Sequence, residues 1–194
     1  MIVPLFVSTG KRAVAVLTPQ QESLIDSFLN ADYKIRKNFL LQTAVRIVEG
    51  RFISQHPECY RKENAAVFLP KVEEIGKKRC TIDNRAVMLS PDGIKAVEDF
   101  FDKKVGLPSY QAMEPAFKRA AKRADIDTRY ITSKMYRKTM ISWLINVYPE
   151  RKEAITHFAG HDDVTMLNHY ITYGFRKDDV KDMKDRVAGW GVQA

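Results

Sequence analysis

The residues from Gly160 to Gly174, GHDDVTMLNHYITYG, hold two histidines and two tyrosines that could carry chemistry. A tyrosine hydroxyl is a poor nucleophile at its ordinary pKa of about 10. It can attack a phosphodiester when cations surround the phosphate and a neighbouring group such as His161 accepts its proton. The structural alternative is that Tyr170 and Tyr173 pack against the core while His161 occupies a turn.

Two other segments supply cations that could hold such a phosphate. Lys134 and Arg137 are three residues apart in KMYR, so a helix places both on one face. An arginine binds a phosphate through two parallel hydrogen bonds, whereas a lysine acts as a point charge. Arg46 lies among apolar residues in TAVRIVEG, where Glu49 could pair with it and orient it. Each pattern also fits a plain structural role, as a solvated basic face or as an ion pair one helical turn long.

The elements that must position these residues are mostly helical. Thr18 followed by Pro19 predicts a helix start, and the next helix is expected over about 33–49, ending at Gly50. In residues 65–90 the segments AVFLP, VEEIG and RAVMLS have strand propensity, and GKKR and DN between them predict turns. An antiparallel sheet of two or three strands is therefore expected in the middle of the chain.

Helix signals return after this sheet. Further helix starts are predicted at Ser90, at Ser109, at Thr132 or Ser133, and at Pro149, and the last of these helices should end at Gly160. A short helix is expected over VTMLNHYIT, and a polar helical segment ends the chain. The prediction is a mainly α domain with a small antiparallel β-sheet (α+β) over 1–175, followed by a helical segment over 176–194.

Composition and charge narrow the class of protein. The 194 residues are 45% hydrophobic and 29% charged, as in ordinary globular domains. The net charge of +8 and the pI of 9.4 are common in proteins that bind nucleic acid. There are two cysteines, no apolar run of about 20 residues and no basic region before the apolar start. We therefore expect a protein of the cell interior, cytoplasmic and associated with the nucleoid, with no membrane contact.

The separate motifs form an ordered set. TAVRIVEG is followed by GKKR, then by KMYR, then by Gly160-His161, with Tyr170 nine residues beyond the histidine. This order and spacing resemble the catalytic domain of the tyrosine recombinases, the phage-integrase family. The resemblance covers most of the chain, from about residue 18 to residue 175. It implies a mainly α domain with a small sheet, in agreement with the elements predicted above.

The resemblance also implies a role for each matching residue. Arg46 and Arg137 would bind the non-bridging oxygens of the scissile phosphate, and Glu49 would support Arg46. Tyr170 would attack the phosphorus, leaving a 3′-phosphotyrosine and a free 5′-hydroxyl. His161 would assist as an acid/base group or as a phosphate ligand.

The leaving oxygen needs a proton, and the resemblance assigns it to a lysine of GKKR. Lys77 is preferred because it follows the glycine, and Lys78 is the alternative. Lys134 stands where most of the family has histidine, a replacement that resembles the integrases of archaeal viruses and plasmids. The scheme needs no metal and no cofactor, and His56 with Cys59 are too few ligands for a zinc site.

The implied function is site-specific DNA strand exchange that integrates or excises a mobile element. Alternatives are a type IB topoisomerase-like enzyme acting on one strand, and a non-catalytic DNA-binding protein of the same fold. Relatives carry an additional N-terminal DNA-clamping domain, whereas some 17 residues precede Thr18 here. We therefore expect either a catalytic fragment or a minimal single-domain recombinase.

The partner implied is double-stranded DNA carrying an attachment site. Contacts to its phosphates are predicted for Arg36, Lys37, Lys118, Arg119, Lys122, Arg123, Arg129 and Lys138. Recombinases of this kind work as homo-tetramers on DNA, through a C-terminal helix donated to a neighbour, and a free monomer is compatible with this. Apolar residues at helical spacing, Val180, Met183, Val187 and Trp190, could anchor such a helix or could fold it back on its own domain.

Overall fold

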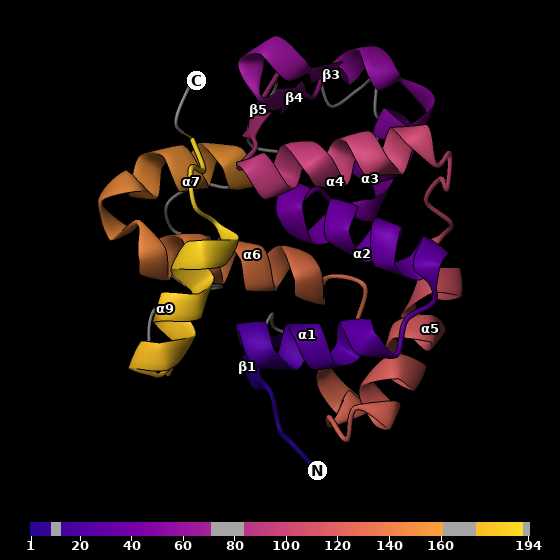
Figure 1. The fold of residues 1–194 in the computed structure, drawn as a ribbon, viewed down its shortest axis with the longest axis vertical. Coiled ribbons are helices and arrows are strands. Elements are labelled where there is room, and N and C mark those ends of the chain that lie inside the picture. The colour runs from indigo at the N-terminus through magenta and orange to yellow at the C-terminus, as the bar shows by residue number, and fades with distance from the viewer. Residues whose placement is uncertain (9–12, 71–83, 161–173, 192–194) are drawn as a thin grey trace.

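The computed structural model describes residues 1–8, 13–70, 84–160 and 174–191 of the chain. Helices dominate this part, and two small antiparallel sheets complete it, which confirms the predicted fold class (Figure 1). The helices are α1 (Pro19–Ser27), α2 (Ala31–Thr43), α3 (Ile47–Gln55), α4 (Pro91–Asp102), α5 (Tyr110–Arg123), α6 (Met135–Val147), α7 (Lys152–Ala159) and α9 (Lys177–Arg186). The strands are β1 (Leu5–Ser8), β2 (Ala13–Val16), β3 (Tyr60–Arg61), β4 (Ala66–Phe68) and β5 (Ala86–Met88).

The N-terminal strands β1 and β2 form a hairpin that the sequence pattern does not predict. The residue that follows the hairpin is hydrogen-bonded to the core, because the backbone N of Leu17 donates to Oγ1 of Thr139 at 3.0 Å. The indole Nε1 of Trp143 donates in turn to the Leu17 carbonyl at 2.8 Å. Thr18 then caps α1 as predicted, with its Oγ1 accepting from the backbone N of Gln21 at 3.2 Å.

Helix α6 is the central helix of the domain. Every residue from 135 to 144 is buried, and α6 packs against α2, β2, α7 and α9. The helix begins after Lys134, slightly later than predicted. Two of its buried residues, Arg137 and Lys138, are cations. A buried cation requires polar or charged partners, so the packing of α6 defines where a polar site must form.

The predicted continuous helix over 33–49 is wrong, because the chain breaks between α2 and α3. Helix α2 ends at Thr43, and Ala44 takes a left-handed conformation with φ 48° and ψ 24°. Arg46 is extended (φ −72°, ψ 151°) and precedes the first turn of α3, which begins at Ile47. The break turns Arg46 from a residue within a helix into a residue at a helix N-terminus.

Gly50, predicted as a helix stop, lies instead inside α3 and is buried. A Cβ at this position would come within 2.5 Å of Cδ1 of Leu107 and 3.2 Å of Cε1 of Phe39. The glycine is therefore explained by close packing of α3 against its neighbours.

A small antiparallel sheet is present, in the order β3-β4-β5. Strands β4 and β5 lie within the predicted segments AVFLP and RAVMLS, β3 was not predicted, and the predicted strand VEEIG lies outside the described residues. Val67 is paired with Tyr60 on one side and with Val87 on the other. The backbone N of Leu69 donates to the Arg85 carbonyl at 2.9 Å, which extends the pairing of β4 with β5 toward their connection. Ser90 then caps α4 as predicted, accepting from the backbone N of Gly93 at 3.1 Å.

The C-terminal helix α9 packs on its own domain in the single chain (Figure 1). Met183, Val187 and Trp190 are buried, and Nε1 of Trp190 donates to the Met88 carbonyl at 3.1 Å. The hydroxyl of Tyr148 donates to the Val187 carbonyl at 3.1 Å. These are three of the four anchors predicted from the apolar spacing, whereas the fourth, Val180, is half-buried. Donation of the helix to a second copy remains a prediction.

Two kinds of feature are absent from the part of the chain that the structure describes. Its helices are too short or too polar to cross a bilayer. It also contains no group of three or more His, Cys, Asp or Glu side chains arranged to hold a metal ion.

Candidate functional site

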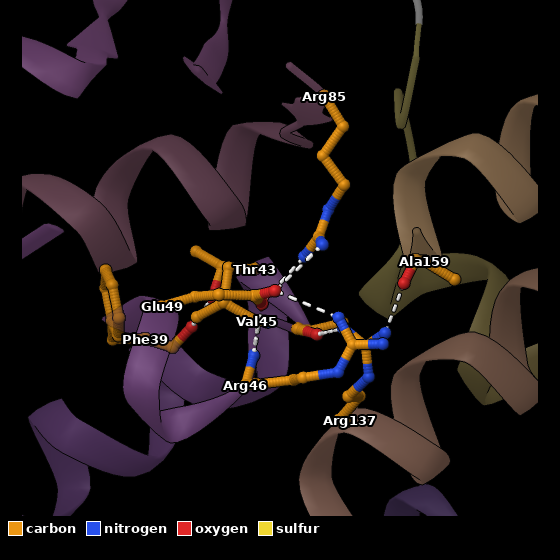
Figure 2. A network of polar contacts seen from close by, with 9 residues as sticks. Phe39, Thr43, Val45, Arg46, Glu49, Arg85, Arg137 and Ala159 are labelled. Carbon is orange, nitrogen blue, oxygen red and sulfur yellow. Dashed lines mark hydrogen bonds and ion pairs between the residues drawn. The ribbon is translucent and has the colours of Figure 1, made fainter. Parts of the chain in front are cut away.

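Glu49 is the centre of a buried polar network at the start of α3 (Figure 2). Its Oε1 accepts hydrogen bonds from Nη1 of Arg46 and from Nη1 of Arg85, both at 2.9 Å. Its Oε2 accepts from the backbone N of Arg46 at 2.7 Å and from Nη2 of Arg85 at 2.8 Å. These donors satisfy the buried carboxylate and hold it in one orientation.

The charge of Glu49 is set by these neighbours. Burial acts to raise the pKa of the Glu49 carboxyl, but the charge and hydrogen bonds of Arg85 and the charges of Arg137 and Arg46 hold that pKa well below its usual range. The group is therefore a carboxylate at neutral pH. One negative charge faces three guanidinium groups, which leaves the network positive and suited to an anion.

Arg46 is the cation of this network that reaches solvent. Its side chain is 29% exposed, and its Nε and Nη2 atoms contact no acceptor among the residues described by the structure. Glu49 pairs with it one helical turn away, as the sequence predicts, and also accepts from its backbone. The N-terminus of α3, with its positive dipole end, lies at the same place. Arg46 can therefore offer two donors to a phosphate while its third nitrogen stays fixed.

Arg137 approaches the network from the first turns of α6 (Figure 2). It is 7% exposed, and its terminal nitrogens donate to the carbonyl oxygens of Ala44 and Ala159. The first carbonyl belongs to the break between α2 and α3, and the second belongs to the last residue of α7. Arg137 therefore joins three helices and adds a fixed positive charge beside Glu49.

Arg85 is a member of the network that the sequence reading missed. It directly precedes β5, is 3% exposed, and makes a two-pronged ion pair with Glu49. A signal for it does exist in the alternation of Arg85, Val87 and Leu89, which places all three on the same face of a strand. Val87 and Leu89 are buried, so Arg85 shares the buried face and must find a carboxylate there.

Gly160 closes the site at the end of α7, where the sequence predicts a helix stop. It is left-handed (φ 60°), and a Cβ there would lie 2.6 Å from Nη1 of Arg85. Both the conformation and the close approach of Arg85 therefore require glycine.

Two lysines lie at the start of α6, Lys134 just before the helix and Lys138 within it. Lys134 is exposed, and its backbone N donates to Oγ1 of Thr132 at 3.2 Å. Lys138 is 9% exposed, and its burial, together with the charges of Arg137, Lys134 and Arg46, lowers the pKa of its ammonium to about 7. The predicted place of Lys138 among surface phosphate contacts is corrected, since it lies inside the protein beside the candidate site.

The fold that holds this site is similar to that of several solved proteins. The chain matches no family model and no curated protein. Among solved structures it is similar to the Tn1549 transposon integrase in complex with transposon right end DNA, with a TM-score of 0.63 and 16% identity over 94% of this chain and 68% of that one. It is also similar to XerA recombinase, with a TM-score of 0.63 and 13% identity over 92% of this chain and 65% of that one.

The chain has the fold of a tyrosine recombinase catalytic domain. A second Tn1549 integrase structure, with circular intermediate DNA, matches with a TM-score of 0.62 at 17% identity over 86% of this chain. The chain spans about two thirds of the length of these solved chains. This confirms the fold that the resemblance implied, whereas the likeness to archaeal integrases stays a prediction.

Within this recombinase fold, four of the predicted catalytic or supporting residues lie outside the described part of the chain. Lys77 and Lys78 belong to residues 71–83, and His161 and Tyr170 belong to residues 161–173. Arg85, two residues after the first segment, and Gly160, directly before the second, both lie at the network. The chain enters the first segment after the Leu69–Arg85 backbone pair and enters the second directly after Gly160.

Two predicted DNA contacts have structural roles in the recombinase fold. Lys37 is 3% exposed, and its ammonium pairs with Glu22 and, at 2.8 Å, with Asp26, so its predicted phosphate contact is wrong. Arg36 donates to the carbonyls of Gly106 and Val105 at 3.0 and 2.8 Å, which connects α2 to the segment that follows α4. Helical spacing alone did not separate these inward cations from surface ones.

The remaining predicted contacts lie at the surface. Arg119, Lys122 and Arg123 are exposed on α5, and Lys118 is partly exposed and pairs with Glu114 at 2.9 Å. Arg129 is 68% exposed and donates to Asp127. These cations remain predicted DNA contacts.

Proposed function

We propose that this chain is the catalytic domain of a tyrosine recombinase that cuts and rejoins DNA, integrating or excising a mobile element. One observation carries the proposal: Arg46, Arg85 and Arg137, from distant parts of the sequence, converge on the single buried carboxylate of Glu49. A site with this excess of positive charge and a partly exposed arginine fits a phosphodiester. The solved neighbours named as DNA complexes support DNA as the partner.

The chemistry follows from the charges. Arg46 and Arg137 would bind the non-bridging oxygens of the scissile phosphate and stabilise the negative charge of the transition state. Because Glu49 is ionised and accepts several hydrogen bonds, it orients Arg46 and does not act as a base. Lys134 would add positive charge beside the start of α6, and Lys138, whose pKa is lowered to about 7, would add it only when protonated.

The bond changes balance without a metal or nucleotide. The Tyr170 oxygen forms a bond to phosphorus as the 5′-oxygen leaves. The tyrosine proton passes to an acceptor, for which His161 is the candidate, and Lys77 or Lys78 donates a proton to the leaving oxygen. The phosphotyrosine retains the energy of the broken bond, so the 5′-hydroxyl of another strand can reverse the step.

The test is capture of the covalent intermediate. Nicked DNA duplexes of random sequence lose the short 5′-hydroxyl fragment after cleavage, so the adduct accumulates and its DNA can be sequenced. We expect Tyr170→Phe to abolish the adduct while DNA binding is retained, and Tyr173→Phe to form it normally. An adduct that persists in Tyr170→Phe and is lost in Tyr173→Phe would overturn the assignment.

The oligomeric state on DNA distinguishes a strand-exchanging recombinase from an enzyme that only relaxes supercoiled DNA. A recombinase would form a tetramer on two DNA sites, whereas a topoisomerase-like enzyme would relax supercoiled plasmid as a monomer. Light scattering with and without the captured DNA sequence distinguishes the two. We expect a monomer without DNA and a tetramer on it, acting in the cytoplasm of the host cell.

A further inference from the structure

We propose that Arg85 is a positioning residue for the proposed strand cleavage, acting through Glu49 to orient Arg46 and joining the three segments of the site. The inference rests on the proposed function and adds a residue to it. At 3% exposure Arg85 does not itself reach a phosphate in solvent, so its effect must pass through its neighbours.

The first neighbour is Glu49. Arg85 makes two parallel hydrogen bonds to its carboxylate, at 2.9 and 2.8 Å, and thereby fixes the plane of the group. Arg46 donates to the same Oε1 atom that accepts from Arg85, and its backbone donates to the other oxygen. A rotation of the carboxylate would move the guanidinium of Arg46, the partly exposed arginine of the network.

The second neighbour is the base of the connection between β4 and β5. The Arg85 carbonyl accepts from the backbone N of Leu69 at 2.9 Å, so this pair closes the connection that contains Lys77 and Lys78. Through its side chain the same residue is bound to Glu49. Arg85 therefore links the base of the lysine segment to the helix that carries Arg46.

The third neighbour is Gly160. Nη1 of Arg85 approaches this position so closely that a Cβ there would lie 2.6 Å away. His161 is the next residue, and the preceding carbonyl, of Ala159, accepts from Arg137. Arg85 thus contacts Leu69 through its backbone carbonyl and approaches Gly160 through its guanidinium, and each of these residues leads into a predicted catalytic segment.

Stability alone does not account for this arrangement. A buried ion pair loses the hydration of both charges, and an apolar pair of similar volume is often as stable or more stable. Among the residues that the structure describes, the buried Nε of Arg85 has no hydrogen-bond partner. The cost of burying Arg85 is explained if the geometry of Glu49 and Arg46 matters for the reaction.

Arg85→Lys keeps the charge and removes the two-pronged bond. In single turnover with saturating DNA, we expect the rate constant of adduct formation to fall by about 100-fold, the effect of a small misplacement of a catalytic group. DNA affinity should be unchanged. The matched control is Arg61→Lys, an exposed arginine of the same sheet, which should keep the wild-type rate constant.

The rate constant distinguishes positioning from folding, because it does not depend on how much protein is folded. A purely structural Arg85 would lower the melting temperature and the amount of adduct at completion while the rate constant stayed the same, and that result would overturn the proposal. If Arg85→Lys does not fold, Gly160→Ala displaces the guanidinium without removing it, and the same loss of rate is expected.

The path through Glu49 is tested by combining variants. Glu49→Gln should also slow adduct formation, and the double variant with Arg85→Lys should be no slower than the slower single variant, since both act on Arg46. Additive losses would show that Arg85 acts by another route and overturn the proposal. If the wild-type protein forms no adduct, the proposed function itself fails, an outcome distinct from an active wild type with an equally active Arg85→Lys variant.

Discussion

The guanidinium of Arg137 donates a hydrogen bond to the carbonyl oxygen of Ala44, 93 residues earlier in the chain. This carbonyl is available because Ala44 is left-handed and ends α2 before Arg46. The same break leaves the backbone N–H of Arg46 without an acceptor in a helix, and the carboxylate of Glu49 accepts its hydrogen bond instead. A single backbone irregularity therefore supplies Arg46 and Arg137, two of the three arginines of the site, with orienting contacts.

Arg46→Lys should slow adduct formation strongly. Lysine preserves the charge but provides no fork to bind both Glu49 and a phosphate, so we expect a loss of about 100-fold in the single-turnover rate constant. Arg51→Lys, at an exposed arginine of the same helix, is the control and should react normally. An unchanged rate in Arg46→Lys would exclude a direct phosphate contact by Arg46.

Glu49→Gln should destabilise the domain. Removing the carboxylate leaves the charges of Arg85, Arg46 and Arg137 uncompensated in a buried site, which costs about 3–5 kcal/mol of unfolding free energy. Urea unfolding followed by circular dichroism measures the change. Glu63→Gln, at an exposed glutamate, should change stability very little. A loss in Glu49→Gln no larger than in this control would contradict the network.

The stabilisation that Glu49→Gln removes should depend on pH. The folded-state pKa of Glu49 is lowered well below the 4.5 of an unperturbed glutamate, so its contribution to stability is present above that value. This contribution is lost as the pH falls through the lower, folded-state pKa. Unfolding free energies measured on acidification should therefore converge for wild type and Glu49→Gln. A constant difference down to the lowest pH at which the protein folds would contradict the assignment.

Lys138 should affect stability on the alkaline side. Its folded-state pKa is about 7 and its ordinary value is 10.5, so between these pH values the unfolded chain binds a proton that the folded protein does not. This group therefore makes the unfolding free energy rise as the pH increases above about 7. Lys138→Met should remove that rise, whereas Lys95→Met, at an exposed position of α4, should retain it. Identical pH profiles for Lys138→Met and wild type would refute the shifted pKa.

Gly160→Ala and Gly106→Ala form a matched pair for the contact with Arg85. Both glycines are left-handed, with φ 60° and 56°, so each substitution costs about 1–2 kcal/mol of backbone strain. A Cβ at Gly106 meets no atom within 4 Å, whereas one at Gly160 comes within 2.6 Å of Arg85. Thermal unfolding should show a clearly larger loss for Gly160→Ala. Equal losses would mean that Arg85 does not pack against this turn.

Local signals predicted much of the fold. Thr18 and Ser90 cap helices with their own hydroxyls, and Gly160 ends α7 because a left-handed residue is needed there. Each of these depends on atoms a few residues apart. The pairing of Arg46 with Glu49 was predictable for the same reason, since the two residues are three apart. The order of the motifs further implied the recombinase fold.

Only the tertiary structure decided which cations are inside and which acceptors they meet. Lys37 and Lys138 look like surface residues in the sequence but are buried, because α2 and α6 pack on several sides. Arg85 meets Glu49 across 36 residues, and Arg137 meets Ala44 across 93. The sequence by itself determined several helix ends and the Arg46–Glu49 pair, since those depend on neighbouring residues, but it missed the β1–β2 hairpin and the break between α2 and α3. The burial of a charge depends on packing between distant segments, and the packing therefore assembled the site.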